Sequence, residues 1–430
     1  MKKYDLAKAS MVFLFAASTS FGAGFGLYQG SAAGNADSTY GTAKGGEPGS
    51  MYLNPAAVTT VPGTQLQLGL ITVAPGITYE GNSVYTGEKL SQDADDKVWP
   101  IPHAYVTHQL NDDWWIGLGM YTRFGLGAEY DEDWFGRYNI YDVSIQSFNI
   151  GPMVAWKAAD WISLSAGLSV QYFDITLKQK IDAAGLSGMR KANDPAFSPL
   201  DVDQELCADG VGVGVDLGVM MTPVEKVNIG VGYHSQIKQD LDGEAKYAKP
   251  APIAAAVPML FNNTDISGEV TLPDLVMSAI TYDVTDKLTV GLGLTYTAWS
   301  TYDELRIKFD SLGAVGMKEK ASEKDWDDAF RYAAGMTYKL DDAITLRASY
   351  TYDESPMNDK HLDYIVPGDN RHIMAVGAGY AMEDWVFDVF YFYEIVEDQE
   401  IAMNVPAGIQ PSEAVDGFAH SLGFSVTRKF

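Results

Sequence analysis

The chain has 430 residues, a formal net charge of -27 and a single cysteine, Cys207. An acidic balance of this size excludes a nucleic-acid-binding role, because phosphates are bound by basic surfaces. One cysteine cannot form an intramolecular disulfide, the histidines show no metal-ligand spacing, and no GxSxG motif is present. The sequence therefore predicts a protein that is not an enzyme and holds neither a metal nor another cofactor.

The N-terminus has the pattern of a secretory signal peptide. Lys2, Lys3 and Lys8 precede an apolar run over residues 11–17, and small residues follow. Ser20 and Gly22 favour cleavage after Gly22, so residues 1–22 are predicted to be removed. No later apolar run approaches the roughly 18 residues that a membrane helix needs. If the mature chain spans a membrane, it must do so with strands.

Residues 23–62 do not alternate between polar and apolar side chains, and they are rich in Gly, Ala and Ser. They would make a poor lipid-facing strand, and we expect them to form an internal plug, or hatch. The stretch MYLNPAAV within them resembles a helix start. Asn54 can cap a short helix whose first position is Pro55, where the missing N–H costs nothing.

Residues 63–430 alternate with a period of two in many segments, for example over 161–172, 288–298 and 344–352. One face is mostly Ser, Thr and Gly, and the other is fully apolar. A soluble sandwich usually carries long charged side chains on its outer face, so this pattern favours a transmembrane barrel with a polar lumen. Strands in lipid must pair every backbone group, which requires closure.

Turns and loops give the number of strands. Short acidic turns are predicted at 111–113, 158–160, 223–225, 285–286, 341–342 and 383–384, and longer loops at 81–99, 126–143, 183–210, 248–264, 310–326, 355–370 and 404–417. Trp114, Trp161 and Trp385 follow three of the turns, as expected for an interfacial girdle. The fold class is therefore an all-β, antiparallel transmembrane barrel of about 14 strands in the bacterial outer membrane.

Short motifs in two parts of the chain resemble the FadL family of outer-membrane transporters for long-chain fatty acids and aromatic hydrocarbons. The first set lies in the predicted hatch and comprises AGFGLY at 23–28, SAAGNA at 31–36 and NPA at 54–56. The second comprises FGLGAEY at 124–130 followed by DWFGRY at 133–138, and the chain also ends on an aromatic residue, Phe430, as outer-membrane barrels do. The resemblance covers the whole mature chain in architecture.

The resemblance implies a passive route for hydrophobic small molecules. A ligand would be caught among extracellular loops, pass to a lumenal pocket, and leave sideways at a kinked third strand. Carried over to this chain, Phe25 would reach towards the pocket. Asn54, Pro55 and Ala56 would hold the hatch, and Gly125 with Leu126 would lie at the kink and lateral exit.

The residues themselves add two predictions. Phe390 and Phe392 share strand parity with Asp388 and Glu394, and carboxylates are disfavoured towards lipid. Both phenylalanines should therefore face the lumen, where they either contact an apolar ligand or pack against the hatch. The apolar loop 250–261 is either packed on itself or part of the capture groove.

The expected partners are a fatty acid or hydrocarbon, outer-membrane lipid including lipopolysaccharide, and the barrel assembly machinery, with the protein itself a monomer. Acidic loop runs such as 93–96 are interpreted as solvated loops, because none has the spacing of a calcium loop. A polar porin is the main alternative, although a porin needs no hatch. An outer-membrane lipid hydrolase is the other, since distant strands could assemble its site.

Overall fold

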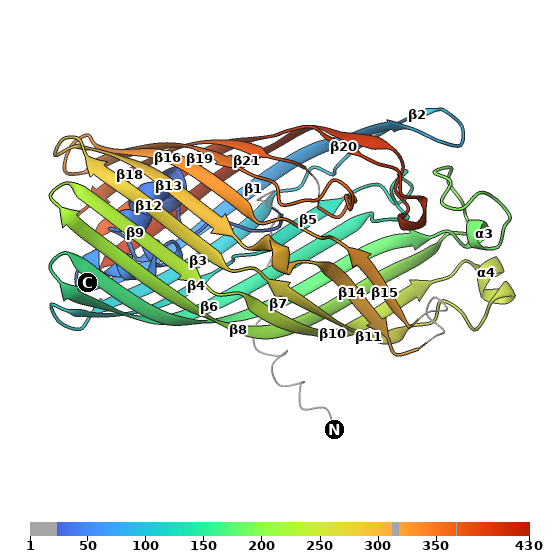
Figure 1. Ribbon diagram of the computed structural model, residues 1–430, viewed down its shortest axis with the longest axis horizontal. Helices are drawn as coiled ribbons and strands as arrows, with labels where there is room; N and C mark the ends of the chain where they lie inside the picture. The colour runs from blue at the N-terminus through green and yellow to red at the C-terminus, as the bar shows by residue number, and fades with distance from the viewer. Residues whose placement is uncertain (1–23, 312–317, 367) are drawn as a thin grey trace, which may run out of the picture.

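The computed structural model describes residues 24–311, 318–366 and 368–430, so the predicted signal peptide lies outside the described residues. It is a closed antiparallel β-barrel of 14 wall strands, which confirms the predicted fold class (Figure 1). The wall consists of β1 (Thr64–Asn82), β3 (Trp99–Gln109), β4 (Trp114–Tyr121) with β5 (Gly125–Glu129), β6 (Asp142–Ala159), β7 (Ile162–Ile181), β8 (Val202–Val224), β9 (Val227–His234) with β10 (Ile237–Ala248), β11 (Thr264–Leu272) with β12 (Leu275–Asp283), β13 (Leu288–Thr297) with β14 (Glu304–Phe309), β15 (Glu319–Glu323) with β16 (Ala329–Lys339), β17 (Ile344–Asp353), β18 (Arg371–Met382), β19 (Trp385–Val396) with β20 (Gln399–Ile401), and β21 (Ser412–Lys429).

The first and last strands close the barrel. β21 pairs antiparallel with β1 from Gln65 opposite Lys429 to Gly81 opposite Ser412. One further short strand, β2 (Lys89–Asp93), pairs with the far end of β1 and lengthens its hairpin. Each of the 14 wall strands has a neighbour on both sides over part of its length, so the sheet closes on itself as a membrane barrel requires.

The outer face of the wall is apolar where it would meet lipid. Leu168, Leu292 and Leu422 each expose more than half of their surface there, at 51%, 64% and 57%. In water this exposure would be unfavourable, whereas a bilayer makes it favourable. Trp114, Trp161 and Trp385 are exposed at the end of the barrel that carries the short turns. No helix within the described ranges is long and apolar enough to cross a membrane.

Longer connections gather at the opposite end of the barrel, which is the right-hand end of Figure 1. They carry α3 (Ala183–Leu186), α4 (Ala251–Ala256) and η4 (Val405–Ala407). Several loops predicted here are shorter than expected, because the strands continue beyond the apolar band. β8, for example, begins at Val202, and its first residues pair with both β7 and β10.

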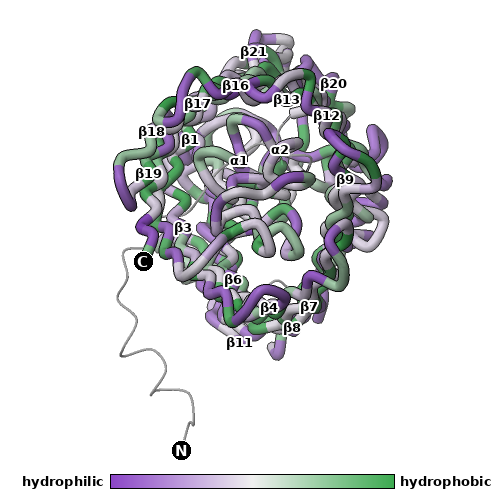
Figure 2. The backbone as a smooth tube through the Cα atoms, turned by 90° about the vertical axis from the view of Figure 1, so that its left-hand side faces the viewer, coloured by the Kyte–Doolittle hydropathy of each residue, from purple (hydrophilic) through white to green (hydrophobic). Residues whose placement is uncertain are grey.

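Residues 24–62, which we call the hatch, lie inside the barrel (Figure 2). Their elements are α1 (Ala32–Ala36), α2 (Ser38–Ala43), η1 (Pro48–Tyr52) and η2 (Pro55–Thr60). The predicted start of a short helix at Asn54 appears as the 3-10 helix η2, with Pro55 in its first turn. Nearly all of the hatch is buried against the inner face of the wall.

Candidate functional site

The third wall strand is interrupted at residues 122–124, between β4 and β5. β4 pairs with β3 from Ala104 opposite Met120 to Gln109 opposite Trp115. β5 pairs with β6 and, among the described residues, has no ladder with β3. The upper part of β3, from Trp99 to His103, therefore pairs with β1 alone. The ladder of the wall therefore has a gap between β3 and β5, and Gly125 and Leu126 are the first residues of the strand that borders this gap.

The free end of the hatch fills part of this gap with backbone hydrogen bonds. The Leu27 amide donates to the Arg123 carbonyl oxygen at 2.7 Å, and the Gly125 amide donates to the Phe25 carbonyl oxygen at 3.0 Å. Gly26 and Phe124 form an antiparallel bridge between these two bonds. The hatch therefore supplies the partner that the kinked strand lacks from β3, so movement of the hatch end would break contacts at the kink.

Phe25 places its ring in an aromatic cage that spans the lumen. Its ring centroid lies 6.0 Å from that of Phe124 at the kink, and 4.8, 5.5 and 5.8 Å from those of Trp299, Tyr302 and Trp326 on the opposite wall. The Phe25 side chain is 1% exposed. Most of these pairs are edge-to-face, which is a favourable aromatic geometry. The cage closes the lumen above the hatch.

Apolar side chains fill the barrel between this cage and the loops. This cluster joins wall residues such as Leu206 and Leu241 to loop residues such as Trp134 and Tyr364. The cavity bordered by Leu206, Leu241 and Ile266 is only about 30 Å³ in volume. A hydrocarbon chain does not fit into a space that holds about one water molecule. The barrel is therefore closed at this cavity, because side chains fill the space.

Asn54 fastens the body of the hatch. Its side-chain oxygen accepts a hydrogen bond from the Ala56 amide at 3.1 Å, which caps η2. Its amide group donates to the Thr42 carbonyl oxygen inside the hatch at 2.9 Å and to the Val219 carbonyl oxygen of β8 at 3.0 Å. Asn54, Pro55 and Ala56 are all fully buried. The Asn54 side chain thus caps a helix and joins the hatch to the barrel wall.

Further polar contacts tie the hatch body to the wall on several sides. Thr337 donates to Asp37 at 2.8 Å, and Lys44 forms an ion pair with Asp283 at 2.6 Å. Glu47 accepts from Ser31 of the hatch and from Gln67 of β1. Burial raises the pKa of both the Asp37 and the Glu47 carboxyl groups above their ordinary values. The hydrogen bonds to these carboxylates lower the pKa, but they offset only part of the effect of burial.

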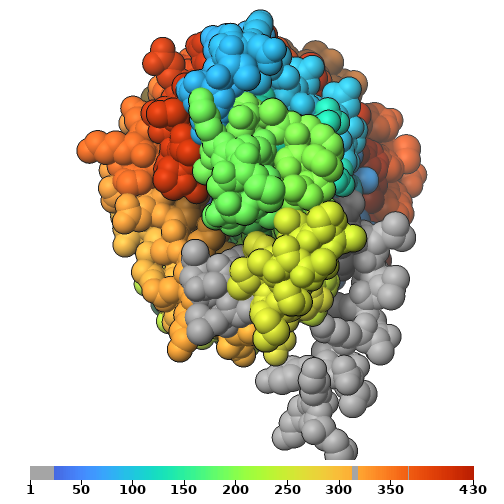
Figure 3. Space-filling model, turned by 90° about the vertical axis from the view of Figure 1, so that its right-hand side faces the viewer, coloured from blue at the N-terminus to red at the C-terminus, as the bar shows by residue number. Residues whose placement is uncertain are grey.

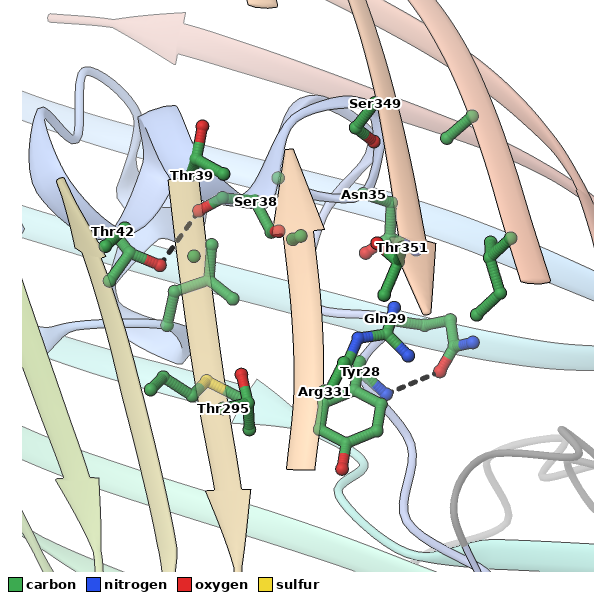
Figure 4. Close-up of a pocket in the computed structure, with 18 of the residues that line it drawn as sticks. Tyr28, Gln29, Asn35, Ser38, Thr39, Thr42, Thr295, Arg331, Ser349 and Thr351 are labelled. Atoms are coloured by element: carbon green, nitrogen blue, oxygen red, sulfur yellow. Dashed lines mark hydrogen bonds between the residues drawn. The ribbon is translucent and has the colours of Figure 1, made fainter. Parts of the chain in front are cut away.

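A small polar cavity of about 50 Å³ separates α2 from the wall (Figure 4). Tyr28 and Gln29 lie on one side of it with Arg331, whose guanidinium stands 4.4 Å from the Tyr28 ring centroid. Arg331 also pairs with Asp353 at 2.9 Å. The surroundings of the hatch thus change along the chain, from aromatic side chains at Phe25 to charged and hydrogen-bonding side chains at Tyr28 and Gln29.

Comparison with known proteins identifies the family. A family model described as outer membrane protein transport protein (OMPP1/FadL/TodX) matches residues 13–430. The chain belongs to this family. It is therefore a transport protein of the outer membrane and not an enzyme.

Individual members of the FadL family agree with this assignment. The long-chain fatty acid transport protein of Salmonella typhi is 24% identical over 378 residues, which cover 83% of each chain. Among solved structures, a Pseudomonas aeruginosa FadL homologue superposes with a TM-score of 0.82 at 20% identity, covering 95% of this chain and 100% of its own. The Pseudomonas putida toluene transporter TodX gives a TM-score of 0.66 at 15% identity, covering 89% and 94%. These structures share the fold.

Two of the predicted site residues lie in a different part of the lumen from the Phe25 cage. Phe390 and Phe392 are buried inside the barrel, on the face that the strand alternation predicts. Phe390 belongs to a cluster with Leu27, Ala32 and Ala36 of the hatch. Packing against the hatch, one of the two alternatives, is therefore what Phe390 does in this closed state. Contact with a ligand remains a prediction for both residues.

Sequence reasoning missed four residues of this FadL-family site. Trp299, Tyr302 and Trp326 lie where alternation stops, in segments that resemble ordinary loops. Arg123 lies in the interruption of the third strand, is 4% exposed, and stacks its guanidinium on Tyr52 and Tyr121 at 5.0 and 4.9 Å. The available signal was the break in alternation itself. Where alternation stops, it no longer indicates which side chains face the lumen, and in these segments large aromatic side chains lie inside the barrel.

The apolar loop 250–261 is partly packed and partly exposed. Ile253 and Phe261 are buried against Ala183 of α3 and Val202 at the start of β8. Met259 is 77% exposed. The two connections, green and yellow in Figure 3, lie side by side over this end of the barrel. Burial of Ile253 and Phe261 agrees with a packed loop, although the packing partners belong to the neighbouring segment. A part for this loop in the capture groove stays a prediction.

Proposed function

We propose that the protein carries hydrophobic small molecules, long-chain fatty acids or related hydrocarbons, passively across the outer membrane. Membership of the FadL family and the names of its relatives support this cargo class. The observation that carries the mechanism is the hydrogen-bonded junction between the hatch end at Phe25–Leu27 and the kinked strand at Arg123–Gly125. It links the lumenal aromatic cage to the side gap in the wall.

Capture begins at the loops. Leu186, Met189 and Phe197 on one connection expose 73%, 63% and 68% of their surface, and Met259 on the neighbouring connection exposes 77%. Large apolar side chains gathered at a surface mark an interaction site for apolar partners. A hydrophobic molecule gains free energy by leaving water for this surface.

Transfer and release follow from the closed packing. A molecule that moves down the apolar cluster meets Phe25 and must displace its ring from the cage. The ring is held by dispersion and aromatic contacts that an apolar ligand can replace. When Phe25 moves, the bonds of Leu27 and Gly125 to the opposite backbone break, and the gap between β3 and β5 opens towards the membrane. Gly125 and Leu126 line this lateral exit.

An uptake assay with matched variants tests this function. In a host that lacks its own transporter, the chain should support growth on a long-chain fatty acid or a hydrocarbon. Leu27→Pro removes the amide that donates to Arg123, and should accelerate dissociation of a bound apolar probe by roughly fivefold, the effect of about 1 kcal/mol. Leu27→Ala keeps that amide and serves as the control.

Two other outcomes would reject the proposal. Large steady ion conductance in planar bilayers without binding of apolar probes would favour a polar porin. Ester hydrolysis that is lost on substitution of a single serine would favour a lipid hydrolase. Equal dissociation rates for Leu27→Pro and Leu27→Ala would remove the kink junction from the mechanism while leaving the cargo class intact.

A further inference from the structure

The wall has a second interruption, on the side of the cage opposite the kinked strand. β11 pairs with β14 only from Ile266 opposite Phe309 to Glu269 opposite Arg306. β12 pairs with β13 from Leu275 onward. Between these ladders the chain bends inward at η3 (Trp299–Thr301), and Figure 1 shows β13 and β14 as separate arrows.

Backbone contacts at this interruption are one-sided. Towards the following strand, the Asp303 carbonyl oxygen accepts from Lys324 and Asp325 at 2.8 and 2.9 Å, and the Ser300 amide donates to Asp328 at 3.0 Å. Towards the preceding strand, the ladder between β11 and β14 ends, among the described residues, at Glu269 opposite Arg306, and beyond it the Ala298 amide donates to the Asp274 carbonyl oxygen at 3.0 Å. The seam between β11 and η3 is thus the weakly bonded edge.

A groove of about 520 Å³ opens on the outer surface along this seam. Its floor includes Val270 and Tyr302, which are 6% exposed and belong to the internal apolar cluster. The Tyr302 ring lies 5.5 Å from the Phe25 ring. A single aromatic side chain therefore separates the outside groove from the residue that the proposed cargo must displace.

Aromatic and charged side chains surround the groove. Tyr296 and Phe330, whose rings pack at 5.4 Å on the outer face, stand next to the interruption and fit the aromatic girdle of the extracellular membrane interface. The lining carries five carboxylates and two cations: Asp240, Asp242, Glu269, Asp303, Glu304, Arg306 and Lys308. An acidic rim repels anions, whereas an uncharged molecule is not repelled.

We propose that this seam is a second side portal, through which uncharged apolar molecules exchange between the outer leaflet and the Phe25 cage. The Tyr302 side chain blocks the portal on its lumenal side, and Val270 and Thr271 of β11 line one edge of it. The inference rests on the proposed function, since it names a further route to the same pocket. It adds a site on the wall opposite the kinked strand.

Steric blocking with a bulky maleimide tests the portal. In a Cys207→Ser background, Thr271→Cys places the label in the groove, and Asp265→Cys places it on the same strand outside the groove. The protein is embedded in lipid nanodiscs, and the binding kinetics of methyl laurate and of laurate are measured. The label at position 271 should slow association and dissociation of the ester together by about twofold or more, with Kd unchanged.

The two probes separate the possible results. Laurate kinetics should be unaffected by the label at position 271, and the label at position 265 should affect neither probe. Unchanged ester kinetics with complete labelling at position 271, or failure of that cysteine to react in the folded protein, would overturn the portal. If neither probe binds the unlabelled protein, the proposed function itself fails. Binding without an effect of the label overturns the portal alone.

Discussion

The two ends of the hatch differ in how they are held. Its body, from Asp37 to Ala57, is fixed by directional polar contacts such as Asn54 to Val219, Asp37 to Thr337 and Lys44 to Asp283. Its free end, from Phe25 to Leu27, is held at the kink by the Phe25 ring and by two backbone bonds, and the Tyr52 hydroxyl of the body donates to the Leu27 carbonyl oxygen. Polar contacts buried in a lumen are costly to break, whereas an apolar ligand can replace ring contacts. The hatch therefore combines a fixed body with a releasable end.

The largest expected effect comes from displacing the fixed body. A Cβ atom at Gly232 of β9 would overlap the Leu53 carbonyl oxygen, while a Cβ atom at Gly293 of β13 meets Ala333 and Thr39 at an ordinary 3.4 Å. Gly232→Ala should therefore dislodge the hatch and raise single-channel conductance, and Gly293→Ala should leave conductance near the wild-type value. Equal conductance in both variants would show that the body tolerates displacement.

Truncating the releasable end comes next. Phe25→Ala removes the ring that closes the cage, and loss of a buried phenylalanine side chain costs roughly 3 kcal/mol. The hatch body should stay docked, so conductance should rise little while exchange of an apolar probe becomes much faster. Stopped-flow binding and bilayer recordings on the same protein check both parts. A conductance increase equal to that of Gly232→Ala would mean that the two ends are not independent.

Removing the fastening of η2 should have a smaller effect. Asn54→Ala deletes the cap and both side-chain donations, at a cost of about 2 kcal/mol. We expect a lower thermal unfolding temperature and intermittent conductance, with probe exchange rates near those of wild type. Asn35→Ala, in a half-buried hatch position outside η2, is a suitable control. Accelerated probe exchange without conductance bursts would assign Asn54 to the releasable end instead.

The smallest expected effect is a pH dependence of docking. The pKa of Asp37 and of Glu47 is raised when the hatch is docked, so the docked state binds protons more tightly than a released state. Docking should therefore weaken as pH rises from the ordinary carboxyl range of about 4 through the raised values. Closed-state leak current should be larger at pH 8 than at pH 5. The double variant Asp37→Asn, Glu47→Gln should show a flat profile.

The wall of this protein was predictable because local rules specify it. Alternation in 288–298 and acidic turns such as 341–342 follow from the lipid and lumen faces of individual strands. The start of η2 at Asn54 and Pro55 was equally local, since a cap and a first-turn proline need only their neighbours. These features do not depend on contacts far apart in the chain.

The cage around Phe25 was not predictable in the same way. Phe25, Phe124, Trp299 and Trp326 come from four distant segments and meet only because the barrel closes. Trp299 and Trp326 lie in interruptions, where strand parity gives no direction for a side chain. The family resemblance predicted Phe25 and Gly125 as site residues, but it carried no information about the opposite wall.

Hydrogen–deuterium exchange of backbone amides tests the central claim most directly. The Leu27 and Gly125 amides donate across the junction between hatch and kink, while the Ala56 and Ala57 amides donate within the fixed body. Addition of a saturating apolar ligand should accelerate exchange at Leu27 and Gly125 and leave Ala56 and Ala57 protected. Unchanged exchange at the junction, or faster exchange at Ala56 and Ala57 instead, would contradict a fixed body with a releasable end.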